Sequence, residues 1–262
     1  MKLIKKKNVS SSVPAAFKKV VTCEYKGRLG NNLFQIAVAV SYAKRISAVS
    51  VFSPWRYSKV FSNNLDFING EKLKNYHMYE EKGFQYSPIE IPSSFDRIKL
   101  SGYFQSEKYF DETLVREVFT PRKDLIRYLR EKYDLNNSVS VHVRRGDYLG
   151  LQDYHPVQNM DYYQEAFSYF QDSKFYVFSD DIDWCKNNFK GNFVFIDKQD
   201  DYLDMFLMSL CNHHIIANSS FSWWGAWLNK NKDKRVIMPK KWFGPSANHD
   251  INDLICHNWN PI

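Results

Sequence analysis

The stretch K-V-V-T-C-E-Y-K-G-R-L-G-N-N-L-F-Q-I-A-V-A-V-S-Y-A-K-R, residues 19–45, decides the fold. Its first seven residues are typical of a buried strand, and the glycines in 27–32 predict a tight turn. Residues 33–45 predict a buried helix with a basic C-terminal end. A second strand-like run, A-V-S-V-F-S, follows at 48–53. Strand, helix and strand in this order predict a β-α-β unit and therefore a parallel sheet.

The same alternation returns after residue 120. Thr120 and Pro121 predict the start of a helix, with the threonine as its cap and the proline in its first position. That helix leads into an alternating strand that opens with S-V-S-V at 138–141, and later strands are expected in K-F-Y-V-F-S, F-V-F-I, H-I-I-A and R-V-I-M. These patterns predict an α/β fold of two Rossmann-like halves. We expect a ligand cleft between the halves or at the carboxyl ends of their strands.

Three segments are expected along the chain. They are a flexible basic tail at 1–20, an N-terminal α/β domain at 21–120 and a C-terminal α/β domain at 121–262. Residues 54–98 are aromatic and polar without a clear period, so no element is predicted there. The 262 residues are 44% hydrophobic, which is enough to bury one large core or two modest ones.

Charge and cysteine usage narrow the class of protein. The formal net charge is +7, but the basic residues are scattered among acids, which favours a small anionic ligand over nucleic acid. No apolar run approaches the roughly 20 residues that a membrane-spanning helix needs, so we expect at most peripheral membrane association. The four cysteines are too far apart for a short-spaced zinc site. They are interpreted as reduced core thiols of a cytoplasmic protein.

The segment H-V-R-R-G-D-Y, residues 142–148, places unusual positive charge at the end of a strand. The period of two sends His142 and Arg144 to one face, and Arg145 points elsewhere. A guanidinium is a fixed two-pronged donor that suits a diphosphate. Alternatively, one of the two arginines pairs with Asp147 as a structural ion pair. For Arg145 the two interpretations stay open, whereas ligand binding is favoured for Arg144.

A second group of polar residues lies where a short apolar strand runs into a helix. Asn218, Ser219 and Ser220 are all good caps, and their hydroxyls and free N–H groups would form a phosphate seat in front of that helix. An ordinary helix cap is the alternative for this stretch. The tryptophans that follow are expected in the core.

Two further motifs are weaker. In G-R-L-G-N-N the backbone at Gly30 can approach a ligand closely, and Asn31 and Asn32 can bond sugar hydroxyls. S-D-D-I-D at 179–183 is similar to metal-binding D-x-D motifs, although a helix cap is favoured there. The sequence lacks G-x-S-x-G, H-E-x-x-H and G-x-x-x-x-G-K-[ST], so common hydrolase, zincin and nucleoside-triphosphatase signatures are absent.

Three blocks taken together resemble the α-1,2-fucosyltransferases of glycosyltransferase family 11. They are G-R-L-G-N-N-L-F-Q at 27–35, V-H-V-R-R-G-D-Y-L at 141–149 and H-I-I-A-N-S-S-F-S-W-W-G-A-W-L at 214–228. G-Y-F-Q-S-E-K-Y-F at 102–110 is also similar to a segment of that family. The resemblance implies a GT-B-like architecture, a GDP-β-L-fucose donor, inverting transfer to the 2-hydroxyl of a terminal galactoside on a glycan, and no metal or other cofactor.

The resemblance also implies roles for individual residues. The donor side falls on the C-terminal half, with Arg144 on the diphosphate and His142 beside the nucleotide. Ser219, Ser220 and Phe221 would line the phosphate pocket. By similarity with more distant fucosyltransferases Asp204 would read the guanine edge, or else it is a helix-surface charge.

The acceptor side is expected in the N-terminal half, with Asn31 near the fucose. Gly30 and Asn32 of the same turn are expected among the substrate contacts, as are Arg145 and Asn218 in the other half. The residue that takes the acceptor's proton is left open between Asp147 and Asp153.

Two other functions remain open from the sequence. One is another nucleotide-sugar glycosyltransferase with a different donor or linkage, since a fold and a phosphate seat do not fix the sugar. The other is a non-catalytic module that binds a glycan or a nucleotide.

Overall fold

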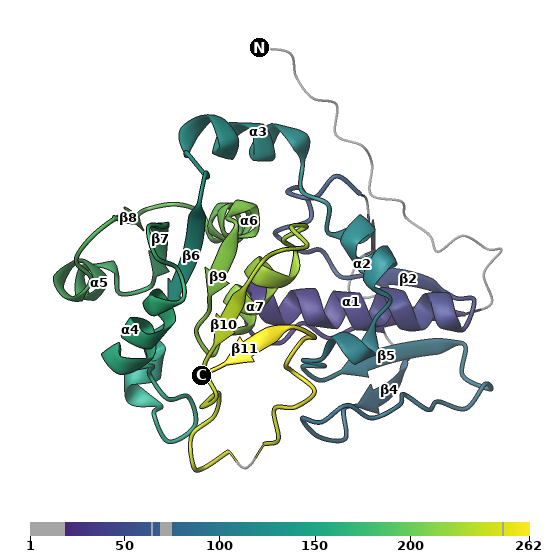
Figure 1. Ribbon diagram of the computed structural model, residues 1–262. Coiled ribbons are helices and arrows are strands. Elements are labelled where there is room, and N and C mark those ends of the chain that lie inside the picture. Colours follow the sequence, from purple (N-terminus) through teal and green to yellow (C-terminus); the bar gives the residue numbers. More distant parts are fainter. Residues whose placement is uncertain (1–18, 64, 69–74, 248) are drawn as a thin grey trace.

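A computed structural model describes residues 19–63, 65–68, 75–247 and 249–262. The expected basic tail lies, up to residue 18, outside these residues. The N-terminal half forms a parallel sheet in the order β3-β2-β1-β5-β4. Its strands are β1 (Val20–Cys23), β2 (Val49–Phe52), β3 (Asp66–Phe67), β4 (His77–Glu80) and β5 (Arg97–Ser101). Figure 1 shows strands β2, β4 and β5 near α1 (Leu29–Arg45).

The C-terminal half forms a second parallel sheet in the order β11-β10-β9-β6-β7-β8. Its strands are β6 (Ser138–Val143), β7 (Lys174–Ser179), β8 (Phe193–Ile196), β9 (His213–Ile215), β10 (Val236–Met238) and β11 (Trp259–Pro261). Every strand predicted in this half is confirmed, and β11 is an addition. Helices and short 3₁₀ turns connect the strands: α1 (Leu29–Arg45), η2 (Glu107–Tyr109), α2 (Glu112–Val118), α3 (Lys123–Lys132), η3 (Asp147–Gly150), α4 (Met160–Ser168), α5 (Ile182–Asn188), α6 (Asp201–Leu210) and α7 (Ser220–Trp227).

Two predicted helix starts are wrong. Helix α1 begins at Leu29, so Gly30 lies in its first turn, and the tight turn is made by Gly27 with a φ of 75°. Helix α3 has Arg122 as its N-cap rather than Thr120. The backbone of residues 120–121 is instead held by an antiparallel bridge between Phe61 and Pro121, which delays the helix.

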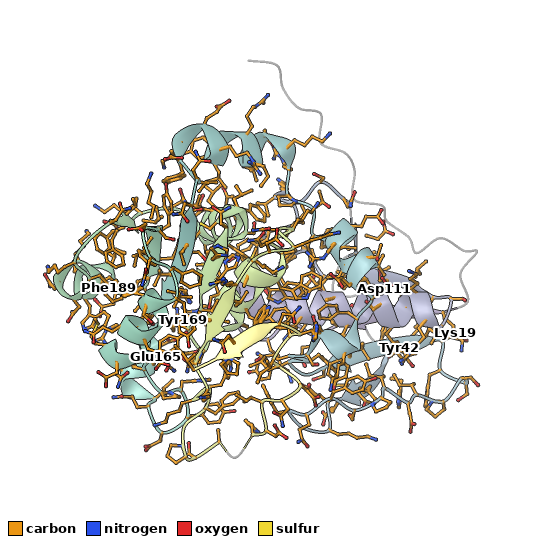
Figure 2. The ribbon with its side chains drawn as sticks, in the orientation of Figure 1. Lys19, Tyr42, Asp111, Glu165, Tyr169 and Phe189 are labelled. Carbon is orange, nitrogen blue, oxygen red and sulfur yellow. The ribbon has the colours of Figure 1, made fainter. Side chains whose placement is uncertain are left out.

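The core is continuous across both halves because α1 packs against α7. The ring of Phe34 on α1 lies 4.5 Å from that of Trp223 and 4.9 Å from that of Trp224. Both tryptophans are fully buried, as is nearly all of Trp227, so the expected core role of the three is confirmed. Figure 2 shows side chains filling the space where α1 meets α7. All four cysteines are buried and free, as predicted, and no described helix has the length and apolar character of a membrane span.

Gly30 sets how closely the two helices approach. A Cβ atom at this position would lie 2.5 Å from the backbone nitrogen of Phe221 and 2.5 Å from the carbonyl carbon of Ser220. Both are backbone atoms, which cannot rotate aside. The first turn of α1 therefore contacts the N-terminus of α7 with no room for a side chain.

We predict that Gly30→Ala lowers the free energy of unfolding by about 1–3 kcal/mol, because it overpacks this contact. At an unconstrained helix position the same change would stabilise by about 1 kcal/mol. Gly83→Ala is the matched control, since a Cβ there meets nothing within 4 Å. Denaturant unfolding of the two variants decides the point, and a Gly30→Ala protein as stable as the wild type would contradict this packing.

Candidate active site

The main cleft of the molecule has a volume of about 480 Å³ and is lined from both halves. It lies at the carboxyl ends of β6 and β7, in front of the N-termini of α1 and α7. Ten predicted site residues line it: Gly30, Asn31, His142, Arg144, Asp147, Asp204, Asn218, Ser219, Ser220 and Phe221. The chain thus brings together residues up to 191 positions apart in sequence, from Gly30 to Phe221.

Two helix N-termini converge on this cleft. Ser219 caps α7 by accepting a hydrogen bond from the backbone N–H of Phe221 at 3.3 Å. Ser220 Oγ donates to Asn31 Oδ1 at 2.6 Å, which ties the first turn of α7 to the first turn of α1. Neither helix carries an acidic residue in its first turn. The positive ends of both helix dipoles therefore face the cleft without a neutralising carboxylate on either helix, an arrangement that favours an anion.

Arg144 extends from the end of β6 into the same cleft. Its Nη2 lies 2.5 Å from Asp147 Oδ1, and its Nη1 lies 2.9 Å from Asp180 Oδ2. Asp147 also lies 3.6 Å from the guanidinium of Arg28. The arginine that pairs with Asp147 is thus Arg144, the one predicted to bind the ligand. An anion that binds Arg144 would therefore displace the carboxylate of Asp147, which already pairs with its guanidinium.

Arg145 points away from the cleft, as the strand period predicts. Its Nε donates to Asp181 Oδ2 at 3.0 Å, and its guanidinium lies over the ring of Trp184 at 4.1 Å. Asp181 in turn caps α5 by accepting from the N–H of Trp184 at 3.2 Å. For Arg145 and for S-D-D-I-D the structural interpretation therefore fits the geometry. No cluster of three or more metal-ligating side chains occurs among the described residues.

Asn32 and Asp153 also lie outside the cleft lining. Asn32 is buried and bonds the backbone carbonyl of Lys26 at 3.3 Å and the indole N–H of Trp55 at 3.2 Å. Asp153 is exposed, and its carbonyl oxygen accepts from Ser246 on the C-terminal loop. These contacts hold loops in place, and neither residue is part of the cleft lining.

Asn218 lines the cleft, but its side-chain amide is already hydrogen-bonded to neighbouring loops. Its Nδ2 donates to the carbonyl oxygens of Pro156 and Trp242, each at 3.0 Å, and its Oδ1 accepts from Gln158 at 3.1 Å. The buried amide therefore joins the loop after η3 to the loop after β10. Its geometry is that of a positioning residue for both loops.

His142 is buried beside Arg144 and has an open ring nitrogen. Burial, with a smaller effect from Arg144, lowers the pKa of His142 to about 3. Its Nδ1 has no hydrogen-bond partner within the described part of the chain, and its ring lies 5.4 Å from that of Phe221. A neutral imidazole with an unpartnered nitrogen is suited to bond a ligand in the cleft.

Sequence reasoning missed the outer wall of the cleft. This wall is aromatic and is made by Phe84, Tyr103, Tyr148, Tyr154, His155 and Phe243. The residues come from four loops, those after β4, β5, β6 and β10, of which only the segments around Tyr103 and Tyr148 had been singled out for their motifs. For Tyr154, His155 and Phe243, the aromatic side chains in Y-H-P at 154–156 and W-F-G at 242–244 were the signal available in the sequence.

A sequence model of glycosyl transferase family 11 matches residues 9–262. The chain belongs to glycosyltransferase family 11. The O-antigen biosynthesis glycosyltransferase WbnK of Escherichia coli is 32% identical over 240 residues, covering 82% of this chain and 76% of that protein. An alpha-1,2-colitosyltransferase of Escherichia coli is 40% identical over 181 residues, covering 61% of each. A Bos taurus galactoside 2-alpha-L-fucosyltransferase is 27% identical over 240 residues, covering 80% of this chain and 64% of that one.

This family 11 glycosyltransferase also resembles solved structures in its fold. The crystal structure of the NodZ alpha-1,6-fucosyltransferase soaked with GDP-fucose matches with a TM-score of 0.54 at 17% identity. The match covers 80% of this chain and 92% of that one. The predicted GT-B-like architecture of two Rossmann-like halves is thereby confirmed.

Asp204 carries the most shifted carboxyl group of the cleft. Burial raises the pKa of Asp204 to about 7, although its Oδ1 accepts a hydrogen bond from Gln199 at 2.9 Å. The folded protein therefore holds this proton more tightly than the unfolded chain does. Stability from this group is present at low pH and is lost as the pH rises through about 7.

We predict that Asp204→Asn becomes progressively more stable relative to the wild type as the pH rises from 5 to 8. Asparagine keeps the shape of the protonated acid and never ionises. Thermal melting of both proteins across this range measures the difference, with Asp233→Asn as a control for the loss of one exposed charge. A constant difference in Tm between pH 5 and pH 8 would show that Asp204 titrates normally.

Proposed function

We propose that this glycosyltransferase moves L-fucose from GDP-β-L-fucose to the 2-hydroxyl of a terminal galactoside on a glycan, with inversion at the sugar's C1. The observation that carries the proposal is that Arg144 and two helix N-termini without acidic residues line one cleft. That arrangement supplies fixed positive potential on converging sides. Family membership and the galactoside 2-alpha-L-fucosyltransferase relative support the sugar and the linkage.

In this proposal Arg144 is the electrophile for the leaving group. When the fucosyl–phosphate bond breaks, negative charge grows on GDP while the sugar becomes oxocarbenium-like. The guanidinium is already charged, and Asp180 holds it in place, so it needs little reorganisation. The diphosphate takes the place of Asp147 on Arg144, and the carboxylate keeps its second partner, Arg28.

The remaining cleft residues hold the donor. Ser219, Ser220 and Phe221 present the α7 N-terminus to the phosphates, and His142 offers its free nitrogen beside them. Asp204 lies on α6, where a protonated or ionised carboxyl can bond a purine edge. Beside them, Gly30 lets the first turn of α1 contact the α7 N-terminus, and the amide of Asn31 faces the sugar.

A second candidate is transfer of colitose through the same linkage. It is favoured by the 40% identity to an alpha-1,2-colitosyltransferase. Colitose is fucose without its 3-hydroxyl, so the two donors differ by one hydrogen-bonding group. A site that hydrogen-bonds this hydroxyl rejects the deoxy sugar strongly, because its polar groups are then left unpaired.

One experiment separates these functions. The protein is incubated with a panel of galactosides and, in turn, GDP-fucose, GDP-colitose, other GDP-sugars and UDP-sugars, and the product linkage is determined by NMR. We expect an α-1,2-linked fucosyl galactoside as the main product. Faster turnover of GDP-colitose than of GDP-fucose would identify colitose as the sugar transferred. Transfer from another donor, or through another linkage, would overturn both candidate functions. GDP binding without any transfer would indicate a non-catalytic module.

We predict that transfer continues in excess EDTA. Arg144 and the two helix N-termini supply the positive potential that a divalent cation supplies in other transferases. The initial rate is measured with and without chelator, and again after manganese is added back. Loss of the rate in EDTA with recovery in manganese would contradict this mechanism and favour a metal at Asp180 and Asp181.

We predict that Arg144→Lys folds normally but loses on the order of a hundredfold in kcat at saturating donor, or about 2.7 kcal/mol. Lysine keeps the charge but cannot present two parallel N–H groups to the diphosphate. Arg145→Lys is the matched control, and it should lose stability through its contacts with Asp181 and Trp184 while its kcat stays near normal. The opposite pattern would show that the roles of the two arginines are reversed.

A further inference from the structure

We infer that His155 is the catalytic base that takes the proton from the acceptor hydroxyl. This inference rests on the proposed function, in which an acceptor hydroxyl attacks the donor sugar. His155 lies on the loop after η3 and lines the cleft on its aromatic wall. It was not among the residues that the sequence pattern suggested.

The two carboxylates nearest Arg144 are already engaged. Asp147 is bound by Arg144 at 2.5 Å and lies 3.6 Å from Arg28. Asp180 pairs with Arg144 and also accepts from the backbone N–H of Arg145 at 2.9 Å. Both carboxylates therefore have cationic or N–H partners that an acceptor hydroxyl would have to displace.

The other titratable side chains of the cleft are also unsuited. Asp201 is bound by Arg56 at 3.0 Å, and Asp204, which accepts from Gln199, is the carboxyl assigned above to the purine edge. His142 is buried beside Arg144, which together with burial holds its pKa at about 3. Among the cleft's Asp and His side chains, His155 remains.

The imidazole of His155 is held by rings rather than by hydrogen bonds. It stacks on Tyr148 with centroids 4.6 Å apart and planes 9° apart, and it meets the edge of Tyr154 at 4.7 Å. Phe243 closes a further side at 6.1 Å. Neither ring nitrogen bonds any residue that the structure describes, so a lone pair is free to accept a proton. The aromatic contacts hold the ring in place and leave its ring nitrogens free to accept a proton.

Burial, rather than the neighbouring charges, keeps this imidazole neutral before reaction. Burial lowers the pKa of His155, Asp147 opposes that effect, and Arg144 adds to it. The ionisable groups packed around the ring are otherwise phenols, Tyr148 and Tyr154, with His249 bonded to the hydroxyl of Tyr154. A neutral ring can accept a proton at pH 7, and Asp147 favours the imidazolium that results.

His155 and Arg144 contact the same aromatic ring, that of Tyr148. The guanidinium lies 5.3 Å from the centroid of Tyr148, and the imidazole stacks on that same ring. The hydroxyl of Tyr148 donates to the carbonyl of Asn218 at 3.1 Å, which fixes the ring in the cleft. The electrophile for the leaving group and the base for the acceptor therefore both contact one fixed aromatic ring.

The step balances as a single displacement. The acceptor oxygen forms a bond to C1 of fucose, and the bond from C1 to the phosphate oxygen breaks with its electron pair remaining on GDP. The hydroxyl proton passes to a ring nitrogen of His155. Arg144 carries the charge of the departing diphosphate, and the imidazolium later loses its proton to solvent.

The test compares His155→Gln with His249→Gln in the full chain. His249 contacts Tyr154 and Phe243 in the same aromatic group but lines no part of the cleft. We expect His155→Gln to lose about 10²–10⁴-fold in kcat, the range for general base catalysis, with its Tm and GDP affinity unchanged. His249→Gln should keep its kcat within about threefold.

The pH profile distinguishes a base from a structural residue. In the wild type kcat/KM should fall as the pH drops through a value below 6.5, because a protonated imidazole cannot accept a proton, and this limb should disappear in His155→Gln. Retention of kcat within about threefold, an unchanged acid limb, or a parallel loss of Tm and GDP affinity would each overturn the inference.

A second measurement needs no substrate and so separates this inference from the proposed function. The His155 ring is titrated by NMR in the GDP complex, with its signals assigned by their absence in His155→Gln. A midpoint below 6.5 is expected, whereas a midpoint above 7 overturns the base role, since the ring would already hold a proton. Failure of the wild type to make any fucosylated product would instead overturn the proposed function, and the titration would still decide the state of His155.

Discussion

The close contact between the N-termini of α1 and α7 is the constraint on which the rest of the molecule depends. Gly30 meets the backbone of Ser220 and Phe221 with no space for a Cβ atom, and Ser220 bonds Asn31 across the same junction. Behind it, Phe34 packs on two buried tryptophans and makes one core of two sheets. Two helix dipoles therefore converge at fixed geometry on a cleft that neither half could form alone.

Electrostatics in the cleft follow from that junction. The helix ends and Arg144 create positive potential, and in the free protein Asp147 and Asp180 occupy the guanidinium. A diphosphate that displaces Asp147 gains both helix ends as additional partners. Preorganised charge of this kind acts where negative charge develops in a transition state and costs little reorganisation when the bond breaks.

Much of this arrangement could be predicted from local pattern. The strand period alone separated Arg144 from Arg145, and cap chemistry placed the start of α7 among Asn218, Ser219 and Ser220, of which Ser219 is the N-cap. The cap of α3 was missed because a long-range bridge from Phe61 to Pro121 overrode the local signal. The aromatic wall and the occupied side chain of Asn218 were also missed, since their contacts join loops that no local pattern connects.

We propose above all that the junction of α1, α7 and Arg144 binds the diphosphate of the donor and contacts its β-phosphate. The most direct measurement is calorimetric titration of the protein with GDP and with GMP, both in EDTA at the same ionic strength. Charge-assisted hydrogen bonds to the β-phosphate contribute about 1.5–3 kcal/mol each, so GDP should bind at least tenfold more tightly than GMP. Equal affinity for the two nucleotides would contradict the account.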